Sequence, residues 1–300
     1  GLVGSEMCIR DSLYSYLISL VMGDDPLHSY RGVQWLNLIS AQLILFLSFL
    51  ILNKAFDISK KKNGWLFLIL SFLATATLNN LIGYHPVAMS ENLFLPITLL
   101  TFSVLILIIK NKRLINNSLI LLLGIIISAS ILTRTIAIVM IPSALLALAL
   151  CFAGKRQDIF KKKHLQLLFK LIVFSLVPVF LFELVEAQFV QNSIQAAATK
   201  DYSSFMSSYS KTFFNLITLK SNLFATIKIV GNHLIYLTVS TFFFPVYFFV
   251  KQFFSQMKNK KFDPLWIFVA SYTFLSMGVS FLHSYGGFQS SPIKYSTYFR

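Results

Sequence analysis

Two ionisable residues stand at the ends of apolar stretches, where their charges could carry chemistry. Glu91 follows His-Pro-Val-Ala-Met-Ser, and Arg134 lies between Thr133 and Thr135. A charge beside hydrocarbon is costly, so an ionisable residue at a membrane edge indicates a functional site. A carboxylate can orient a hydroxyl nucleophile or bind a divalent cation, and a guanidinium matches the oxygens of a phosphate group. Together, Glu91 and Arg134 predict a polar reaction chamber at the rim of a bilayer.

Each of these two residues also has a purely structural interpretation. Ser90 can cap a helix that begins near Asn92, and an acid in the first turn of that helix favours its dipole. Arg134 can mark a turn whose charge reaches the membrane interface, with Thr133 or Thr135 capping the helix that follows. The sequence leaves both interpretations open beside the functional one.

Four further residues are candidates for the same chamber. Arg31 could hold a phosphate group, and His85 could be a second metal ligand beside Glu91. Asp24 and Asp25 are adjacent carboxylates, which can hold Mg²⁺ or Mn²⁺. Their alternatives are plain, because a loop histidine is commonly solvated and Gly-Asp-Asp-Pro is an ordinary turn composition. The sequence therefore leaves a divalent cofactor open.

The composition places the chain among membrane proteins. Of its 300 residues, 56% are hydrophobic and only 12% are charged. A soluble domain of this size cannot hide so much apolar surface, because its own surface must be largely polar. The formal net charge of +15 does not indicate a nucleic-acid partner, because the lysines lie in short blocks between apolar runs. Membrane topology explains such blocks.

The apolar runs predict an all-α, polytopic transmembrane helix bundle. A span needs about 20 apolar residues to cross roughly 30 Å of hydrocarbon. The run from Leu114 to Ala153 would be about 60 Å long as a single helix, so we expect it to break at Arg134. With that break we expect eight spans, at about 33–52, 65–83, 93–109, 116–132, 135–153, 167–187, 233–250 and 264–282.

Lysine and arginine predict which ends of the spans are cytoplasmic. Most of them fall in four short connections, around 54–62, 110–113, 155–170 and 251–261. Positive residues favour the cytoplasmic side, so the other side holds Glu91, Arg134 and the longest non-spanning segment, 188–232. The segment 13–22 is too short to cross and predicts a helix at the membrane interface.

The first residues of the chain look foreign to the rest. They have no helical pattern, and they resemble the translated adapter peptide that remains at the ends of poorly trimmed sequence assemblies. We therefore expect residues 1–12 to be non-native and residues 13–300 to form a single transmembrane domain. We also expect the sequence to be a fragment that lacks both ends of its natural protein.

Three short segments, taken in order, resemble a known family. Leu13–Leu20 (LYSYLISL) resembles the segment that follows the two prolines of a PPLY motif. Met89–Phe94 (MSENLF) resembles an outer-loop SE-x-LF motif, and Ile131–Thr135 (ILTRT) resembles an LTRP turn with threonine in the place of proline. With the alternating spans, they resemble the GT-C superfamily of integral membrane glycosyltransferases, nearest to its protein mannosyltransferase and aminoarabinose transferase branch.

This resemblance covers roughly residues 13–145 and implies an enzyme. Such an enzyme moves a sugar from a polyprenyl-phosphate donor to a lipid, glycan or protein acceptor on the extracytoplasmic face of a membrane. The resemblance places Glu91 in the active site and Arg134 near the lipid phosphate, and some branches use a divalent metal such as Mg²⁺ or Mn²⁺. The family's key aspartate lies upstream of the PPLY-like segment, so we expect this fragment to be inactive by itself. We expect the natural protein in the inner membrane of a bacterium.

Two other classes of protein stay open from the sequence. A transporter or lipid flippase would place ionisable residues near mid-span and would often contain inverted repeats. A non-catalytic membrane assembly protein would keep Glu91 and Arg134 only as markers of topology. The position of both charges at span ends and the lack of an internal repeat favour the transferase.

Overall fold

The computed structural model is helical almost throughout the part of the chain that it describes. No strand occurs among the described residues, which confirms the all-α class predicted from the sequence. The chain falls into two compact units, Gly1–Val185 and Glu186–Arg300. The described residues are 12–22, 25–60, 62–76, 90–111, 116–152, 162–193, 231–232, 235, 244–259 and 263–290.

Within the described residues, four helices are long and apolar enough to cross a membrane, and two shorter apolar helices accompany them. All of them coincide with spans predicted from the sequence. The long ones are Leu27–Lys54, Glu91–Lys110, Thr135–Phe152 and Lys163–Phe182, and the shorter ones are Asn117–Thr133 and Pro264–Val279. A further helix, α4, occupies the first part of the predicted span 65–83, whose remainder lies outside the described residues.

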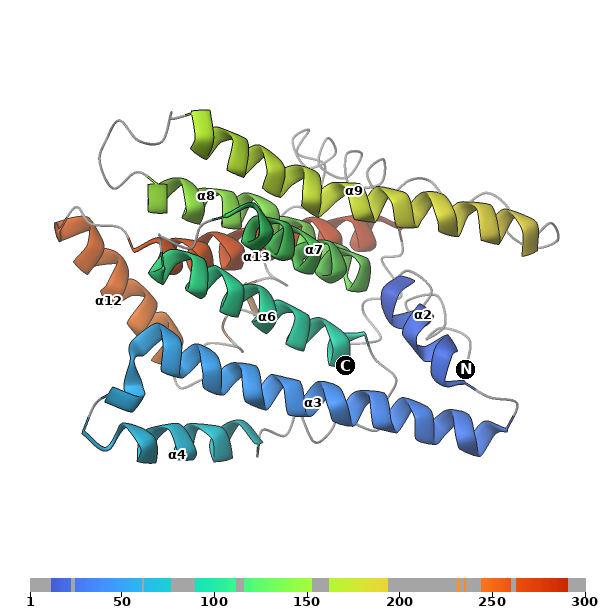
Figure 1. Cartoon of the computed structure of the whole chain (residues 1–300), viewed down its shortest axis with the longest axis horizontal. Coiled ribbons are helices and arrows are strands. Elements are labelled where there is room, and N and C mark those ends of the chain that lie inside the picture. The colour runs from blue at the N-terminus through green and yellow to red at the C-terminus, as the bar shows by residue number, and fades with distance from the viewer. Residues whose placement is uncertain are drawn as a thin grey trace. The chain divides into compact units, whose positions relative to one another are not determined.

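The first unit is a bundle in which α3 packs against α6, α4 and α2, and α6 packs in turn against α7 (Figure 1). The predicted interfacial segment 13–22 is helical, as α2. The elements of the unit are α2 (Ser12–Val21), α3 (Pro26–Phe56), η2 (Ile58–Lys60), α4 (Gly64–Ala76), α6 (Glu91–Lys110), α7 (Asn117–Thr133), η4 (Thr135–Val139), α8 (Met140–Phe152) and the first part of α9 (Lys162–Ser193).

Two polar contacts establish the directions of these helices. Lys110, the last residue of α6, donates to Asp57 Oδ2 at 2.6 Å, directly after α3, so α3 and α6 run in the same direction. Asn117, the first residue of α7, accepts a hydrogen bond from Lys170 of α9 at 3.0 Å. The lysine-bearing ends of these helices therefore lie at one end of the unit. The start of α6 and the end of α7 lie at the opposite end.

Helix boundaries follow local sequence chemistry. The side chain of Asn116 caps α7 by accepting from the backbone N–H of Leu119 at 2.9 Å. Helix α3 ends before Asp57, which has a φ of 49° in the left-handed region. An aspartate tolerates this conformation better than most residues do, because its short polar side chain bonds locally.

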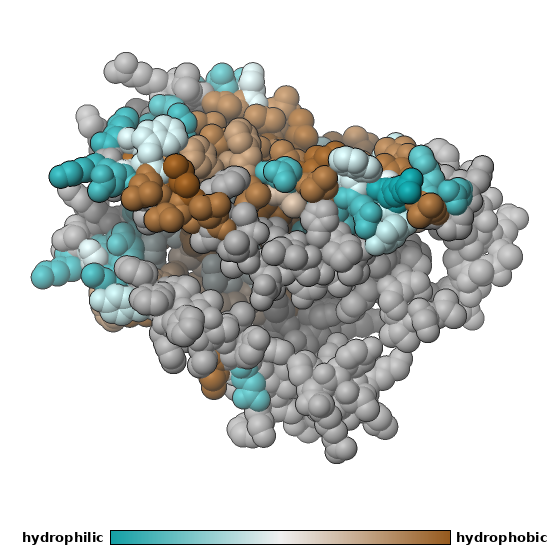
Figure 2. Space-filling model, turned by 90° about the horizontal axis from the view of Figure 1, so that it is seen from below, coloured by the Kyte–Doolittle hydropathy of each residue, from teal (hydrophilic) through white to brown (hydrophobic). Residues whose placement is uncertain are grey.

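Much of the surface is apolar. Figure 2 shows one face on which apolar residues gather in a broad area with hydrophilic residues at its margins. Large exposed apolar side chains on α3 and α4 include Leu43, Phe46, Leu66, Ile69 and Leu70. A soluble monomer rarely exposes contiguous apolar surface of this kind, and helices of this length match the hydrocarbon thickness of a bilayer.

The second unit contains a hairpin of α12 (Phe244–Asn259) and α13 (Pro264–Ser290). The ring of Trp266 packs 5.2 Å from that of Phe249, between centroids. The buried Gln256 accepts a hydrogen bond from the backbone N–H of Asp263 at 3.1 Å, which joins α12 to the start of α13. Helix α12 continues past residue 250, where the predicted span ends. Lys251 is accommodated because its ammonium lies 5.7 Å from the centroid of the Tyr247 ring, one turn back along the helix.

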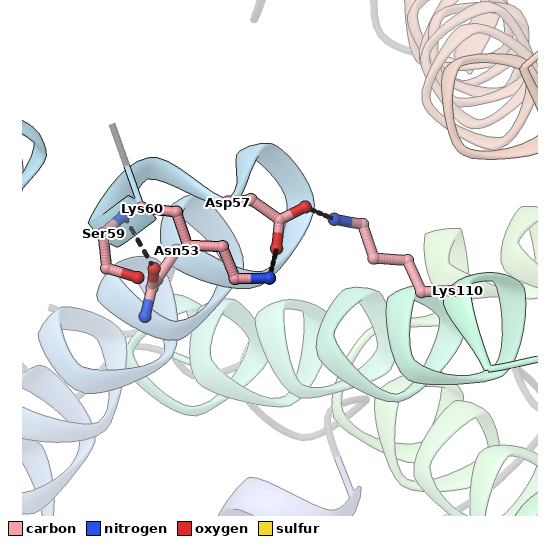
Figure 3. Close-up of polar contacts among 5 residues, drawn as sticks. All are labelled: Asn53, Asp57, Ser59, Lys60 and Lys110. Atoms are coloured by element: carbon pink, nitrogen blue, oxygen red, sulfur yellow. Dashed lines mark hydrogen bonds and ion pairs between the residues drawn. The ribbon is translucent and has the colours of Figure 1, made fainter. Parts of the chain in front are cut away.

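A charged cluster around Asp57 joins α3 to α6 (Figure 3). Asp57 Oδ2 lies 2.6 Å from Lys110 Nζ, and Asp57 Oδ1 lies 3.6 Å from Lys60 Nζ. Beside them, Asn53 accepts a hydrogen bond from the backbone N–H of Ser59 at 3.2 Å, which holds the turn after α3. The hydrogen bond and charge of Lys110, with a smaller contribution from Lys60, hold the pKa of Asp57 below its ordinary value.

This cluster gives the first testable prediction. Because the pKa of Asp57 is lower in the folded chain than in the unfolded chain, its contribution is complete above the ordinary carboxyl pKa and is lost as pH falls through the lowered pKa. We expect Asp57→Asn to lower the unfolding temperature slightly at neutral pH and to leave it unchanged below the lowered pKa. Unfolding temperatures measured against pH for both proteins check this. A constant difference at every pH would contradict it.

Gly124 gives the second prediction, because it lets α7 and α9 approach closely. A Cβ on Gly124 would lie 2.5 Å from Phe174 Cβ, whereas a Cβ on Gly278 in α13 would have nothing within 4 Å. Alanine normally favours a helix over glycine by about 1 kcal/mol. We expect Gly278→Ala to raise the unfolding temperature slightly. We expect Gly124→Ala to destabilise the fold by about 1–3 kcal/mol, because the extra methyl overpacks the contact. Thermal unfolding in detergent checks both, and equal effects would contradict the close contact.

Candidate functional site

Glu91 and Arg134 meet at the end of the first unit that lies opposite the Asp57 cluster. Arg134 Nη1 is 2.9 Å from Glu91 Oε1, and the two side chains are 40% and 41% exposed, respectively. The pair joins the start of α6 to the junction between α7 and η4. The sequence predicted one chamber for these two residues from separate stretches of chain, and the structure brings them into direct contact.

Glu91 is the first residue of α6, and Ser90 precedes it at the cap position. The expected side-chain cap by Ser90 is wrong: its φ of −61° and ψ of −24° are helical, and its side chain makes no capping hydrogen bond. Capping requires an extended residue whose oxygen faces the next backbone N–H groups. Instead, the Ser90 hydroxyl donates to Glu91 Oε2 at 3.5 Å. One carboxylate oxygen therefore faces a hydroxyl and the other faces a guanidinium.

Arg134 is the single extended residue between two helical segments, with φ −149° and ψ 123°. The predicted break of the long apolar run at Arg134 is confirmed. The expected cap by Thr133 or Thr135 is wrong, because Arg134 itself occupies the cap position of η4 and no side chain bonds there. The hydroxyl of Thr133 donates back to the carbonyl of Ala129 at 2.7 Å. In an apolar environment this carbonyl is the nearest acceptor for a threonine.

The electrostatics of the helix ends favour both charges. Glu91 lies at the positive end of the α6 dipole, and Arg134 follows the negative end of α7. The ion pair uses one of the five N–H donors of the guanidinium. Within the described residues, no other partner of the Arg134 guanidinium is recorded. The remaining donors can hold an anion such as a phosphate group while Arg134 stays next to Glu91.

The remaining predicted candidates are not gathered around this pair in the described chain. Arg31 is exposed on the first turns of α3. Asp25 caps α3, and its Oδ1 accepts from the backbone N–H of Leu27 at 3.1 Å, which is the turn interpretation of this residue. Asp24 and His85 lie outside the described residues.

A divalent cation does not fit the described surroundings of Glu91. Among the residues that the structure describes, no group of three or more histidine, cysteine, aspartate or glutamate side chains could hold a metal ion. The neighbours of the Glu91 carboxylate are the Ser90 hydroxyl and the positively charged Arg134. A cation at this place would meet the repulsion of the Arg134 guanidinium, which is the positive charge next to Glu91.

Sequence reasoning missed the hydroxyl groups that lie below the pair. Thr98 of α6 and Ser128 of α7 are buried, and within the described chain their hydroxyls have no hydrogen-bond partner. A signal for them was present, because hydroxyl side chains recur within the apolar spans of α6 and α7, as at Thr98, Thr101, Ser128 and Ser130. A hydroxyl in a span is usually satisfied by its own helix, so only the structure distinguishes those that are not.

Comparison with known proteins adds no relative. No protein family, curated protein or solved structure matches the chain.

The third prediction concerns the stability that the Glu91–Arg134 pair provides. Exposed ion pairs contribute between about 0 and 1 kcal/mol. We therefore expect Glu91→Gln and Arg134→Gln each to lower the free energy of unfolding by less than about 1 kcal/mol. Asp57→Asn, at the opposite end, is the matched control. Denaturant unfolding in detergent measures all three. A loss of unfolding free energy above about 3 kcal/mol at either residue, as for a broken buried pair, would show that the contact mainly stabilises the fold.

Proposed function

We propose that the protein is a membrane glycosyltransferase of the GT-C type. It moves a sugar from a polyprenyl-phosphate donor to a hydroxyl of a lipid, glycan or protein acceptor. The observation that supports this is the contact of 2.9 Å between Arg134 Nη1 and Glu91 Oε1 at one end of a bundle of apolar helices. A carboxylate that can accept a proton therefore lies beside a guanidinium that can bind phosphate, as transfer from a lipid-linked phosphate requires.

Each residue has a distinct part in the proposed transfer. The guanidinium of Arg134 binds the donor phosphate through its remaining N–H groups and stabilises the charge that grows as the phosphate leaves. The carboxylate of Glu91 accepts a hydrogen bond from the acceptor hydroxyl and orients its oxygen. The bond between the anomeric carbon and the phosphate oxygen breaks, and its electron pair leaves with the polyprenyl phosphate. The acceptor oxygen forms the new bond to the anomeric carbon and loses its proton to the Glu91 carboxylate.

The ion pair also suggests an order of events. A donor phosphate bound to the remaining N–H groups shares the positive charge of the guanidinium with the Glu91 carboxylate, since both are anions. Donor binding therefore loosens the contact between Arg134 and Glu91 and frees the carboxylate for the acceptor. Because the pair is half-exposed, this exchange costs little. The site stays charge-balanced while it is empty and becomes active when the donor arrives.

The topology supports an extracytoplasmic active face. Lys60 and Lys110 meet at Asp57, and Lys170 contacts Asn117 at the same end of the first unit. We assign this end to the cytoplasm, because lysine and arginine favour that side. Glu91 and Arg134 then face the outside of the inner membrane of a bacterium.

A transporter or flippase is the competing proposal. It would use ionisable residues near mid-span, where they meet a substrate in transit. In the described helices Glu91 and Arg134 lie at helix ends. This placement favours chemistry at one face over movement from one face to the other.

The fourth prediction tests the proposed roles in membranes that contain the full-length protein, with polyprenyl-phosphate mannose and polyprenyl-phosphate aminoarabinose as donors. We expect Glu91→Gln to lower kcat by about 10²–10⁴, the usual contribution of a positioned acid or base. We expect Arg134→Lys to raise the KM for the donor, because an ammonium cannot form the forked contact. Asp57→Asn is the control and should keep both constants.

A charge exchange separates catalysis from a structural tie. The double variant Glu91→Arg with Arg134→Glu restores an ion pair between the same helix ends but places each group on the wrong substrate. We expect it to stay inactive while its unfolding temperature falls only slightly, because each charge then opposes the dipole of its helix end. Recovery of transfer in the double variant, or a normal rate for Glu91→Gln, would overturn the proposed function.

A further inference from the structure

Buried polar side chains in the first unit are confined to part of its depth. On α6 and α7 they lie between the Glu91–Arg134 end and Thr101, just past the middle of α6. Beyond Thr101 on α6, and before Ser128 on α7, the buried side chains are apolar, such as Leu105, Ile108, Ile120 and Leu123. The buried polar residues of the unit are Asn37, Ser40, Ser90, Thr98, Thr101, Ser128, Ser130, Thr133, Ser143 and Ser175.

Most of these hydroxyls are satisfied within their own helix. Thr101 donates to the carbonyl of Ile97 at 3.1 Å, Ser130 to that of Ile126 at 3.0 Å, and Ser143 to that of Val139 at 2.8 Å. Each acceptor lies one helical turn back. This is the ordinary solution for a hydroxyl in an apolar helix, and only a rotation of the side chain is needed to reach it. A buried hydroxyl that does not make this bond therefore points elsewhere.

Three hydroxyls do point elsewhere. Thr98, Ser128 and Ser175 are 8%, 2% and 0% exposed, and their oxygens have no hydrogen-bond partner among the residues that the structure describes. A buried polar group without a protein partner commonly bonds to an ordered water molecule.

Thr98 and Ser128 lie at similar depth below the ion pair, and Ser175 lies about one helical turn deeper. Thr98 is seven residues along α6 from Glu91, which is about 10 Å at 1.5 Å per residue. Ser128 is six residues back along α7 from Arg134, which is about 9 Å. The two helices pack side by side with opposite chain directions. Both therefore extend from the ion pair towards the same end of the unit. Ser175 of α9 follows Phe174, which packs against Gly124, one turn below Ser128.

We propose that Thr98, Ser128 and Ser175 bind water, and that a hydrated site extends from the Glu91–Arg134 pair to about half the depth of the bundle. The polar side chains lead to it from the Glu91 end, and the apolar half closes it from the Asp57 end. Neutral hydroxyl groups can both donate and accept, so they suit water and the hydroxyls of an acceptor more than a phosphate. The proposal does not depend on sugar transfer, because any polar substrate would need such a site.

Cysteine labelling tests this in the full chain, in a background with Cys8→Ala and Cys151→Ala. The probe is the membrane-impermeant reagent sulfonatoethyl methanethiosulfonate, which reacts only with thiols that water reaches. We expect Thr98→Cys and Ser128→Cys to react from the Glu91 side at least about tenfold faster than equally buried thiols in a dry core. Leu105→Cys and Leu123→Cys are those controls, because both positions are fully buried in the apolar half. No substrate is added, so the result is independent of the transferase assay.

Equal labelling at all four positions, or no labelling at Thr98→Cys and Ser128→Cys, would overturn the proposal. Labelling of Thr98→Cys or Ser128→Cys from both sides of the membrane would show a water path through the bundle, which would contradict a site closed at the Asp57 end. A second measurement covers variants that fail to fold. In a hydrated site Thr98→Val lowers the unfolding temperature, because bonds to water are lost, whereas in a dry one it raises it. Thr101→Val is the control, because its hydroxyl is already satisfied by Ile97.

Discussion

The first unit is organised by the cost of leaving charge in hydrocarbon. Its apolar helices need only lipid around them, so every charge must lie at an end of the bundle and find a partner or water there. The structure meets this constraint twice, with Asp57 and Lys110 at one end and Glu91 and Arg134 at the other. The ends of α6 carry one member of each pair. This helix is therefore the element that sets the distance between the two polar ends.

The two ion pairs have similar chemistry but different surroundings. Asp57 follows α3 in a left-handed turn and contacts two lysines, so its charge is over-compensated and its geometry is fixed by the chain. Glu91 and Arg134 contact each other in one place, and Arg134 is an extended residue between helices. Arg134 has further N–H donors with no partner among the described residues, so it can exchange partners when an anion arrives. Lys110 is held by Asp57 directly after α3, and this contact joins α3 to α6. The two ion pairs therefore differ in how many N–H donors their cation has available for a further ligand.

The sequence predicted what depends on length and periodicity. The spans, the break at Arg134 and the common end for Glu91 and Arg134 all follow from bilayer thickness and alternating direction.

The predictions about capping were wrong at Ser90 and Thr133 for one physical reason. In an apolar environment a hydroxyl bonds the nearest available oxygen, which here is the Glu91 carboxylate or a carbonyl one turn back. Capping rules assume water as the alternative partner. The contact between Asp57 and Lys110 joins residues far apart in sequence, and no local pattern predicts it.

The distribution of polarity in the core bears on which class of protein this chain belongs to. A carrier that moves a substrate across a membrane needs polar groups that both faces can reach in turn. In the described part of α6 and α7 the buried polar residues end near Thr101 and Ser128, and Leu105, Ile108, Ile120 and Leu123 follow. A substrate that entered from the Glu91 end would meet a well-packed apolar core, whose opening would expose buried side chains to water. An enzyme that takes its donor and acceptor from one face has no need of a second opening. The closed half is therefore a condition of one-sided chemistry, because it keeps the Glu91–Arg134 end isolated from the side on which the lysines lie.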